Sequence, residues 1–362
     1  MKYTITLLII GLFSSPMTQA QTTIDGIECD YSQSTFNSSE SVNATSKSEW
    51  SCNDNTRKLT ANGLPDHAVG EFPNDNNPTK ISEQNISVTF PLIPIETSTA
   101  TQLGGPRGAQ GYVLNGIKID ASTAGSCDDS GSNCSLINPS GNWHIEALGP
   151  SSFNFGTDEN NAHVQPGGEY HYHGIPEGFV SMLGGNSSTI TLIAWAADGF
   201  PIYARYGHSV ANDATSSIKA MIGSFQLLDS PLALRPSADT YPLGTFKEDW
   251  EYVHGSGDLD ECNGRVGVTP EFPAGIYHYY ATDSYPYFQR CVKGEVEVST
   301  AVQGGNGIDR RRPDFAAAAN RLGVSERTLM NAIGGPPPNF NKASTILGIP
   351  VAQIRDAVRS SR

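Results

Sequence analysis

The stretch TITLIAWAADGFPIYA at residues 189–204 decides the fold class of this 362-residue chain. Its first seven residues form a nearly continuous apolar run, which is typical of a strand buried on both faces. Residues 198–201 form a turn sequence, because glycine and proline interrupt regular structure there. Residues 202–204 then predict a second short strand. The stretch therefore predicts strand, turn and strand within a buried sheet.

The same β-like texture extends from about residue 81 to residue 290. Residues 86–90 alternate between apolar and polar side chains, and residues 112–119 predict a hairpin with an Asn-Gly turn. Residues 275–280 form another aromatic, strand-like stretch. Helical periodicity is nearly absent over this range. We expect an all-β or β-dominated main domain, closed as a sandwich or barrel so that its edges are protected.

The segment NNAHVQPGGEYHYHG at residues 160–174 holds three of the eight histidines. In an extended chain His171 and His173 point to the same face, and the tyrosines beside them point to the other. The turn chemistry of residues 165–168 would fold His163 back beside this strand. Imidazole is a favoured ligand of zinc, copper, iron and nickel, so the spacing favours three-histidine coordination. The alternative is that these are half-buried, hydrogen-bonded structural histidines.

Three further side chains are candidates to complete such a site. His278 is expected to come from a facing strand, and His144 is either a fourth ligand or a strand histidine beside Trp143. Asp198 either stabilises its turn or supplies a carboxylate that binds metal or orients a histidine. Tyrosines near the site would supply hydrogen bonds around the ligands or, with copper, redox partners: Tyr170, Tyr172, Tyr203 and Tyr277. The turn-like surroundings of the remaining histidines predict surface positions for His67, His208 and His254.

The N-terminal residues and the cysteines indicate export. Residues 1–20 predict a signal peptide, with a positive charge, an apolar core and small residues before a cleavage point near Ala20. No later stretch is apolar for long enough to span a membrane. Six cysteines in an exported chain suggest disulfides. Proximity along the sequence predicts the pairs Cys29–Cys52, Cys127–Cys134 and Cys262–Cys291.

Charge and motif content exclude several classes of function. The formal net charge of −14 and the pI near 4.9 make nucleic acid an improbable partner. The chain contains no nucleophile elbow, P-loop, dinucleotide fingerprint or His-Glu-x-x-His motif. Serine-hydrolase and nucleotide chemistry therefore have no support.

The C-terminal part repeats itself. Phe315 and Phe340 begin two segments offset by 25 residues, and apolar residues keep the same register in both. We predict a small all-α module of two 25-residue helical repeats at 313–360, joined through a linker at 301–312. The rest divides into a polar region at 21–80 that packs on the main domain, and the β domain at 81–300. A helical module on an exported chain favours packing, the cell surface or a protein partner over DNA.

Several blocks together resemble the YHYH-domain family of exported proteins over about residues 85–294. One is the histidine segment itself, and the second is ADGFPIY at residues 197–203. The third begins with LDECNGR at residues 259–265 and continues through GIYHY at 275–279 to Tyr287. The resemblance implies a metal-associated role and brings no particular reaction with it.

The leading hypothesis is an exported, periplasmic or extracellular protein that binds copper or zinc through His163, His171 and His173. The runner-up is a secreted enzyme that uses this metal hydrolytically or oxidatively, which requires an open coordination position and a cleft. The third is a cell-surface module that recognises a glycan, a small molecule or a protein, with structural histidines. Only the first two require the three side chains to converge.

Overall fold

The two strands predicted within residues 189–204 lie at the centre of an eight-stranded sheet. β15 (Thr191–Ala196) pairs with β16 (Pro201–Ala204) in antiparallel fashion, and β15 is buried along almost its whole length. The strands of this sheet, in spatial order, are β13 (Ala162–Val164), β14 (Tyr170–Tyr172), β9 (Lys118–Ile119), β8 (Gly111–Val113), β15, β16, β22 (Ile276–Ala281) and β21 (Gly264–Gly267). The β14–β9 and β16–β22 pairs are parallel, and the other pairs are antiparallel.

The structure is a computed structural model that describes residues 22–24, 27–29, 31–53, 55–150, 153–296, 315–333 and 340–359. The chain divides into two units, Met1–Gly304 and Gly305–Arg362. The predicted signal peptide and the predicted linker at 301–312 lie outside the described residues. None of the described helices has the length and apolar character that a membrane span needs.

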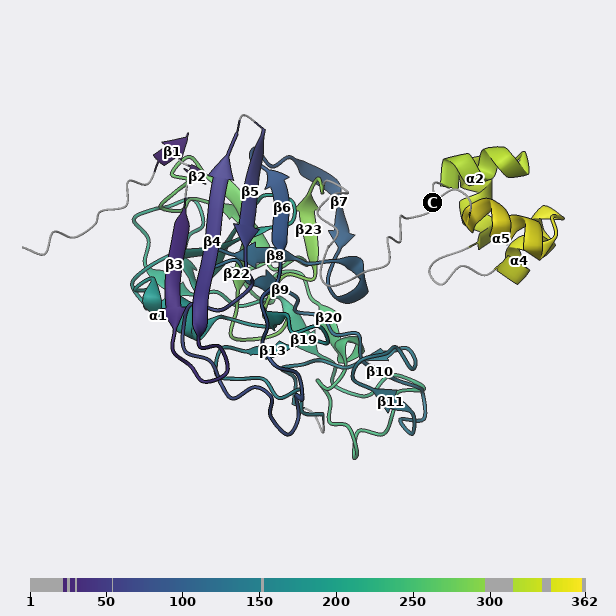
Figure 1. Cartoon of the computed structure of the whole chain (residues 1–362), viewed down its shortest axis with the longest axis horizontal. Helices are drawn as coiled ribbons and strands as arrows, with labels where there is room; N and C mark the ends of the chain where they lie inside the picture. The colour runs from purple at the N-terminus through teal and green to yellow at the C-terminus, as the bar shows by residue number, and fades with distance from the viewer. Residues whose placement is uncertain are drawn as a thin grey trace, which may run out of the picture. The chain divides into compact units, whose positions relative to one another are not determined.

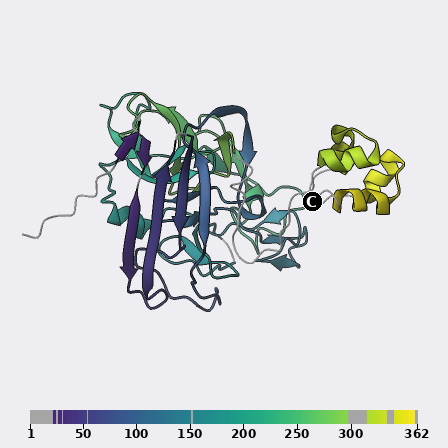
Figure 2. The ribbon, with the colours of Figure 1, turned by 45° about the horizontal axis from the view of Figure 1, so that its top comes forward.

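A second sheet, drawn in purple and blue in Figures 1 and 2, covers the main sheet with four antiparallel strands. These are β3 (Ser32–Asn37), β4 (Ala44–Cys52), β5 (Thr56–Ala61) and β6 (Ile86–Pro91). Buried and exposed side chains alternate along β5 and β6, as expected where one face of a sheet is solvated. Because β5 pairs with β6, the predicted boundary at residue 80 falls inside one sheet.

Both sheets contribute to one hydrophobic core. Trp50 and Phe90 of the second sheet belong to the same buried cluster as Tyr112 and Trp195 of the main sheet. The guanidinium of buried Arg57 lies 3.2 Å from the centroid of the Trp195 ring, a cation–π contact between the layers. The first unit is therefore β-dominated and layered, as predicted.

The remaining strands form small sheets around these two. They are β1 (Thr22–Ile24) with β2 (Ile27–Cys29), β7 (Glu96–Gln102) with β23 (Cys291–Gly294), β17 (Tyr206–His208) with β18 (Ile218–Ala220), β19 (Phe225–Leu227) with β20 (Trp250–Tyr252), and β10 (Ser126–Cys127) between β11 (Cys134–Ser135) and β12 (Trp143–His144). The short helices of this unit are η1 (Gly105–Arg107), α1 (Glu177–Met182) and η2 (Lys247–Asp249). Disulfides join Cys29 to Cys52, Cys127 to Cys134 and Cys262 to Cys291, the three pairs predicted from sequence proximity.

The second unit is the predicted small helical module. Its helices are α2 (Phe315–Leu322), α3 (Glu326–Ile333), α4 (Phe340–Leu347) and α5 (Val351–Arg359). The first helix of each pair begins at Phe315 or Phe340, and Ser325 caps α3 by accepting a hydrogen bond from the Thr328 N–H. Repeat-equivalent Leu329 and Ile354 are both fully buried in one core.

Candidate metal centre

Two neighbouring strands at one edge of the main sheet carry the three clustered histidines. β13 and β14 pair so that His163 lies directly opposite His171. The N–H of His173 donates to the carbonyl of Asn161, which extends this pairing beyond β14. Because side chains alternate along a strand, His171 and His173 share one face and Tyr172 faces the other. We call His163, His171 and His173 the histidine cluster.

The nitrogen atoms of the histidine cluster converge. Nε2 of His163 lies 3.1 Å from Nε2 of His173, and one nitrogen of each ring lies within 4.8 Å of the others. Two ligand nitrogens of a tetrahedral zinc ion are about 3.3 Å apart when the bonds are 2.0–2.1 Å long. A small adjustment of the rings therefore brings three ligand atoms to the spacing that a metal ion needs.

Backbone carbonyls fix the orientation of two of these rings. Nδ1 of His163 donates to the carbonyl of Phe155 at 2.9 Å, and Nδ1 of His171 donates to that of Glu169 at 3.2 Å. A carbonyl only accepts, so Nδ1 carries the proton in each neutral ring and Nε2 keeps its lone pair. Metal-binding histidines typically have this arrangement.

Burial keeps the rings in the neutral form that binds metals. It lowers the pKa of His163, and it lowers the pKa values of His171 and His173 well below the ordinary range. Repulsion among the three rings and from Lys118 acts in the same direction. The unprotonated ligand form is therefore favoured at neutral pH.

A tight turn sets the distance between the two histidine strands. The Gln165 N–H donates to the Glu169 carbonyl, and the Gly168 N–H donates to the Gln165 carbonyl, each at 3.0 Å. Gly168 has a φ of +86°, and a Cβ atom there would lie only 1.8 Å from Oγ of Ser82. Gly167 also has a positive φ, but no atom lies within 4 Å of its would-be Cβ. Glycine is thus required at 168 by both conformation and space.

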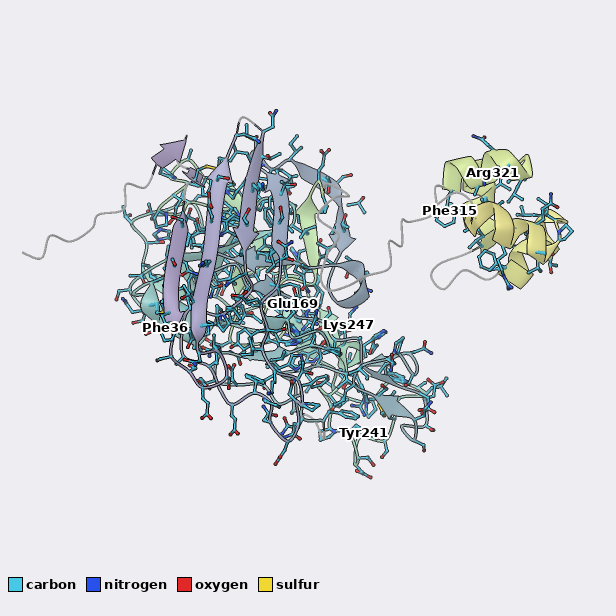
Figure 3. The ribbon with its side chains drawn as sticks, in the orientation of Figure 1. Phe36, Glu169, Tyr241, Lys247, Phe315 and Arg321 are labelled. Atoms are coloured by element: carbon cyan, nitrogen blue, oxygen red, sulfur yellow. A yellow bond between two sulfur atoms is a disulfide. The ribbon has the colours of Figure 1, made fainter. Side chains whose placement is uncertain are left out.

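A buried set of charges lies beside the histidine cluster. Lys118 stands next to His171 in the parallel β9–β14 register. Its Nζ donates to Glu169 at 2.8 Å and to Oε1 of Gln165 at 3.0 Å, and lies 3.6 Å from Oδ2 of Asp120. Glu169 is labelled in Figure 3. The strand alternation places these side chains on the face that carries His171.

A cavity of about 450 Å³ opens onto this face. The histidine cluster, Lys118 and Asp120 line it. Its apolar lining includes Leu136, Ile137 and Phe155. Its size falls in the range of small-molecule sites, and three protein ligands leave room for a further ligand on a metal ion.

The structure places His278 away from the histidine cluster. It lies on β22 in the same sheet as β14, five strands away, or roughly 24 Å at the usual strand spacing. Its Nδ1 donates to the Ile276 carbonyl at 2.9 Å, and its Nε2 accepts from the Tyr280 hydroxyl at 3.0 Å. The expectation of a facing strand is therefore corrected, because strand order cannot be read from local sequence.

His144 and Asp198 also have other roles. His144 is an exposed residue of β12, and its Nδ1 lies 2.7 Å from Oε1 of Glu248. Oδ1 of Asp198 accepts from the Phe200 N–H at 3.3 Å, and Oδ2 accepts from the Tyr279 hydroxyl at 2.5 Å and the Gly294 N–H at 2.8 Å. Burial raises the pKa of Asp198 to about 6. The carboxylate thus stabilises its turn and holds β23.

The four predicted tyrosines hydrogen-bond to partners outside the histidine cluster. Tyr170 donates to Asp158 at 2.7 Å, Tyr172 contacts His67 at 2.6 Å and Asn115 at 3.0 Å, Tyr203 donates to Glu271 and contacts the Thr269 hydroxyl, and Tyr277 donates to Asp260. Tyr170 and Tyr172 lie on the face opposite the histidines, so they support the strand rather than the ligands.

Two histidines expected at the surface are buried. His67 is only 4% exposed, and its Nδ1 donates to the Ala68 carbonyl while its Nε2 accepts from the Tyr172 hydroxyl. His208 is also buried, with Nδ1 3.4 Å from the Ser216 carbonyl. Turn-like sequence around a histidine does not show what packs over it. His254 is exposed, as expected.

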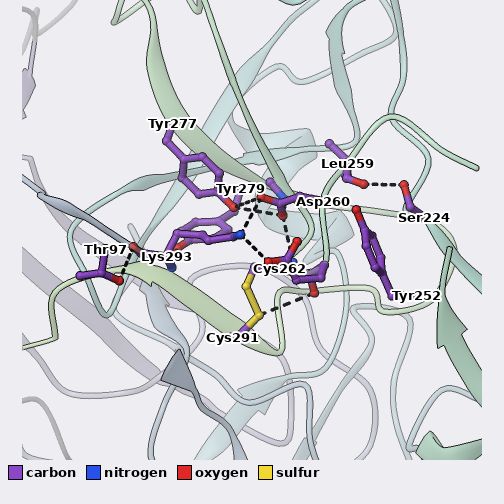
Figure 4. Close-up of polar contacts among 12 residues, drawn as sticks. Thr97, Ser224, Tyr252, Leu259, Asp260, Cys262, Tyr277, Tyr279, Cys291 and Lys293 are labelled. Atoms are coloured by element: carbon purple, nitrogen blue, oxygen red, sulfur yellow. Dashed lines mark hydrogen bonds and ion pairs between the residues drawn. A yellow bond between two sulfur atoms is a disulfide. The ribbon is translucent and has the colours of Figure 1, made fainter. Parts of the chain in front are cut away.

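A separate polar network surrounds the Cys262–Cys291 disulfide (Figure 4). Asp260 accepts hydrogen bonds from the Tyr277 hydroxyl, and the Lys293 ammonium donates to the Glu261 carboxylate. The backbone N–H of Lys293 donates to the Tyr279 hydroxyl at 2.8 Å. Burial raises the pKa of Asp260. This network fastens β23 beside the main sheet and adds no ligand to the histidine cluster.

Sequence reasoning missed Lys118 and Asp120. Both belong to the predicted hairpin at residues 112–119 or follow it directly, where a polar residue alternates with an apolar one. That alternation placed them on one face, but only the β9–β14 register brings this face to the histidines.

One of three comparisons with known proteins gives a match. The profile of the family described as "YHYH protein" matches residues 87–294, which is more than half of the chain. No curated protein matches the chain. No solved structure matches it either. The matched region contains the whole histidine cluster and the sheet that carries it, and the chain therefore belongs to the YHYH protein family.

Proposed function

We propose that this protein binds a divalent transition-metal ion, zinc or copper, through His163, His171 and His173. The observation that carries the proposal is the convergence of three neutral imidazoles, of which His171 and His173 are buried and His163 is half-buried, two of them with Nδ1 held by carbonyls. Such a donor set suits both metals. These residues would bind and orient the ion, while the ion would supply Lewis acidity or, as copper, electron transfer.

The setting that we propose is outside the cytoplasm. The three disulfides support this, because such bonds persist in oxidising compartments. The predicted signal peptide at residues 1–20 would direct export into the periplasm or the medium.

A second candidate is a secreted enzyme that uses the same ion. The cavity favours this candidate, because a catalytic metal needs a coordination position that a ligand can reach. A purely structural site would be closed by protein on all sides.

Elemental analysis of the full-length, untagged protein tests metal binding. We expect about one zinc or copper ion per chain, and an affinity lowered by about 100-fold or more in a His171→Ala/His173→Ala variant. His163→Ala changes a half-buried ring on the edge strand and tests the same point with less risk to folding. His254→Ala, at an exposed position, is the control that should retain the ion. A folded wild-type protein that takes up neither metal would contradict the proposal.

A further inference from the structure

The cavity beside the histidine cluster has two chemically different parts. The rings of the cluster, Lys118 and Asp120 supply a polar part, and all belong to β9, β13 and β14 or adjoin them. The apolar lining comes from elsewhere in the chain and includes Ala124, Leu136 and Phe155. A ligand that matches both parts has a polar head and an apolar body.

The charges around the polar part determine the sign of that head. The ammonium of Lys118 is already engaged by Glu169 at 2.8 Å and Gln165 at 3.0 Å. The Lys118–Glu169 pair is therefore neutral as a unit and offers no free cation to a ligand. Asp120 lies 3.6 Å from the same ammonium, its Oδ1 accepts from the Gly105 N–H at 2.7 Å, and as a carboxylate it adds one negative charge, although burial raises its pKa. With a divalent ion on the histidine cluster, one positive charge is left without a partner.

We infer that the cavity binds a small monocarboxylate with an apolar or aromatic body, whose carboxylate completes the coordination of the metal. This inference rests on the proposed metal centre. One negative charge on the ligand balances the remaining positive charge, which favours a monoanion over a neutral molecule. The body of the ligand lies against Leu136 and Phe155, and its burial adds to the affinity.

Calorimetric titration of the zinc-loaded, full-length protein with benzoate tests the inference. We expect benzoate to bind about tenfold or more tightly than benzyl alcohol, which lacks the charge, and than acetate, which lacks the apolar body. Removing zinc should abolish measurable benzoate binding. Equal affinity for benzoate and benzyl alcohol, or equal binding to the zinc-free protein, would overturn the inference.

Two cavity variants separate this inference from the metal proposal. Ala124→Phe fills the apolar part and should weaken benzoate about tenfold or more while one zinc ion per chain remains. Ile137→Glu, at a position that is 64% exposed, adds a negative charge at the cavity and should weaken benzoate with little risk to folding. Ala214→Phe, at an exposed position outside the cavity, is the matched control.

The outcomes are distinguishable. Full zinc binding together with unchanged benzoate affinity in Ala124→Phe and Ile137→Glu overturns the monocarboxylate inference alone. Failure of the wild-type protein to bind zinc or copper overturns the metal proposal and this inference with it.

Discussion

Asp198 illustrates how one buried carboxylate can serve the fold although its sequence context also suited a metal ligand. Three donors reach it, from Phe200, Tyr279 and Gly294, so its oxygens are engaged within the protein. The residue joins the β15–β16 turn to β23, which are far apart in the sequence. Its contribution to the stability of the fold comes from these hydrogen bonds.

Replacing Asp198 by Asn should destabilise the fold by about 1–3 kcal/mol, because an amide NH₂ group would face a donor. The folded-state pKa of about 6 exceeds the ordinary value of 3.8. The folded protein therefore takes up a proton first, and the contribution of Asp198 to stability grows as the pH falls from about 6 to 4 and is lost as the pH rises through 6.

Urea denaturation of the wild type and Asp198→Asn at several pH values measures this effect. The difference in free energy of unfolding should be larger at pH 4.5 than at pH 7.5. Other titrating groups are present in both proteins and cancel. Asp239→Asn, at an exposed position, is the control variant. A difference that shrinks at low pH would contradict the assignment.

At the scale of secondary structure, the strands could be predicted from side-chain patterns. β6, the β8–β9 hairpin, β15 and β22 lie where alternation or apolar runs placed them. Helix α1 was not expected, because its six residues are too few to establish a helical period. The alternation of buried and exposed side chains depends on the local sequence. It therefore predicts a strand but not the strands that pair with it.

The histidine cluster could be predicted because its residues are close together in the sequence, whereas the residues around it come from distant parts of the chain. His163, His171 and His173 lie within one hairpin, whose geometry follows from a few consecutive residues. Lys118 comes from a strand 53 residues before His171 and reaches it only through a parallel pairing. His278 lies in a similar sequence motif, but this motif is on a distant strand of the same sheet, so the similarity did not predict its position.

The turn between β13 and β14 allows a prediction with an internal control. Gly168→Ala should weaken metal binding and stability more than Gly167→Ala, by about 1–2 kcal/mol in stability. Both glycines have a positive φ, so both substitutions carry conformational strain. Only at Gly168 would the new methyl group also collide with Ser82, which displaces the turn that spaces the histidines.

Metal titration and urea denaturation of the two alanine variants measure this ordering. A Gly168→Ala variant that binds zinc as tightly as Gly167→Ala would show that the turn does not control the spacing of the cluster.

At the scale of the whole molecule, the two units have separate hydrophobic cores. The main core extends across both large sheets, whereas the core around Leu329 and Ile354 contains residues of the C-terminal helices alone. Stability in each unit therefore depends on its own packing.

Calorimetry of the full chain should show two unfolding transitions. Leu329→Ala removes a fully buried side chain and should lower the transition of the helical unit alone, by about 2–5 kcal/mol in free energy. Met330→Ala changes the neighbouring residue, which is 43% exposed, and should have a much smaller effect. A single transition that shifts as a whole would contradict independent unfolding.

The position of β13 at the border of the main sheet gives the proposed ion a mechanical consequence. β13 has three residues and pairs with β14 as its one neighbouring strand in the described sheet, while the Asp158 N–H donates to the Ala162 carbonyl and the Asn77 side-chain amide donates to the Val164 carbonyl on its other side. An ion bound by His163 on β13, by His171 on β14 and by His173 just after β14 would link these two strands. Metal loading would make local opening of these two strands less frequent and would therefore slow proteolysis there. At low metal concentration the protein would then be degraded faster.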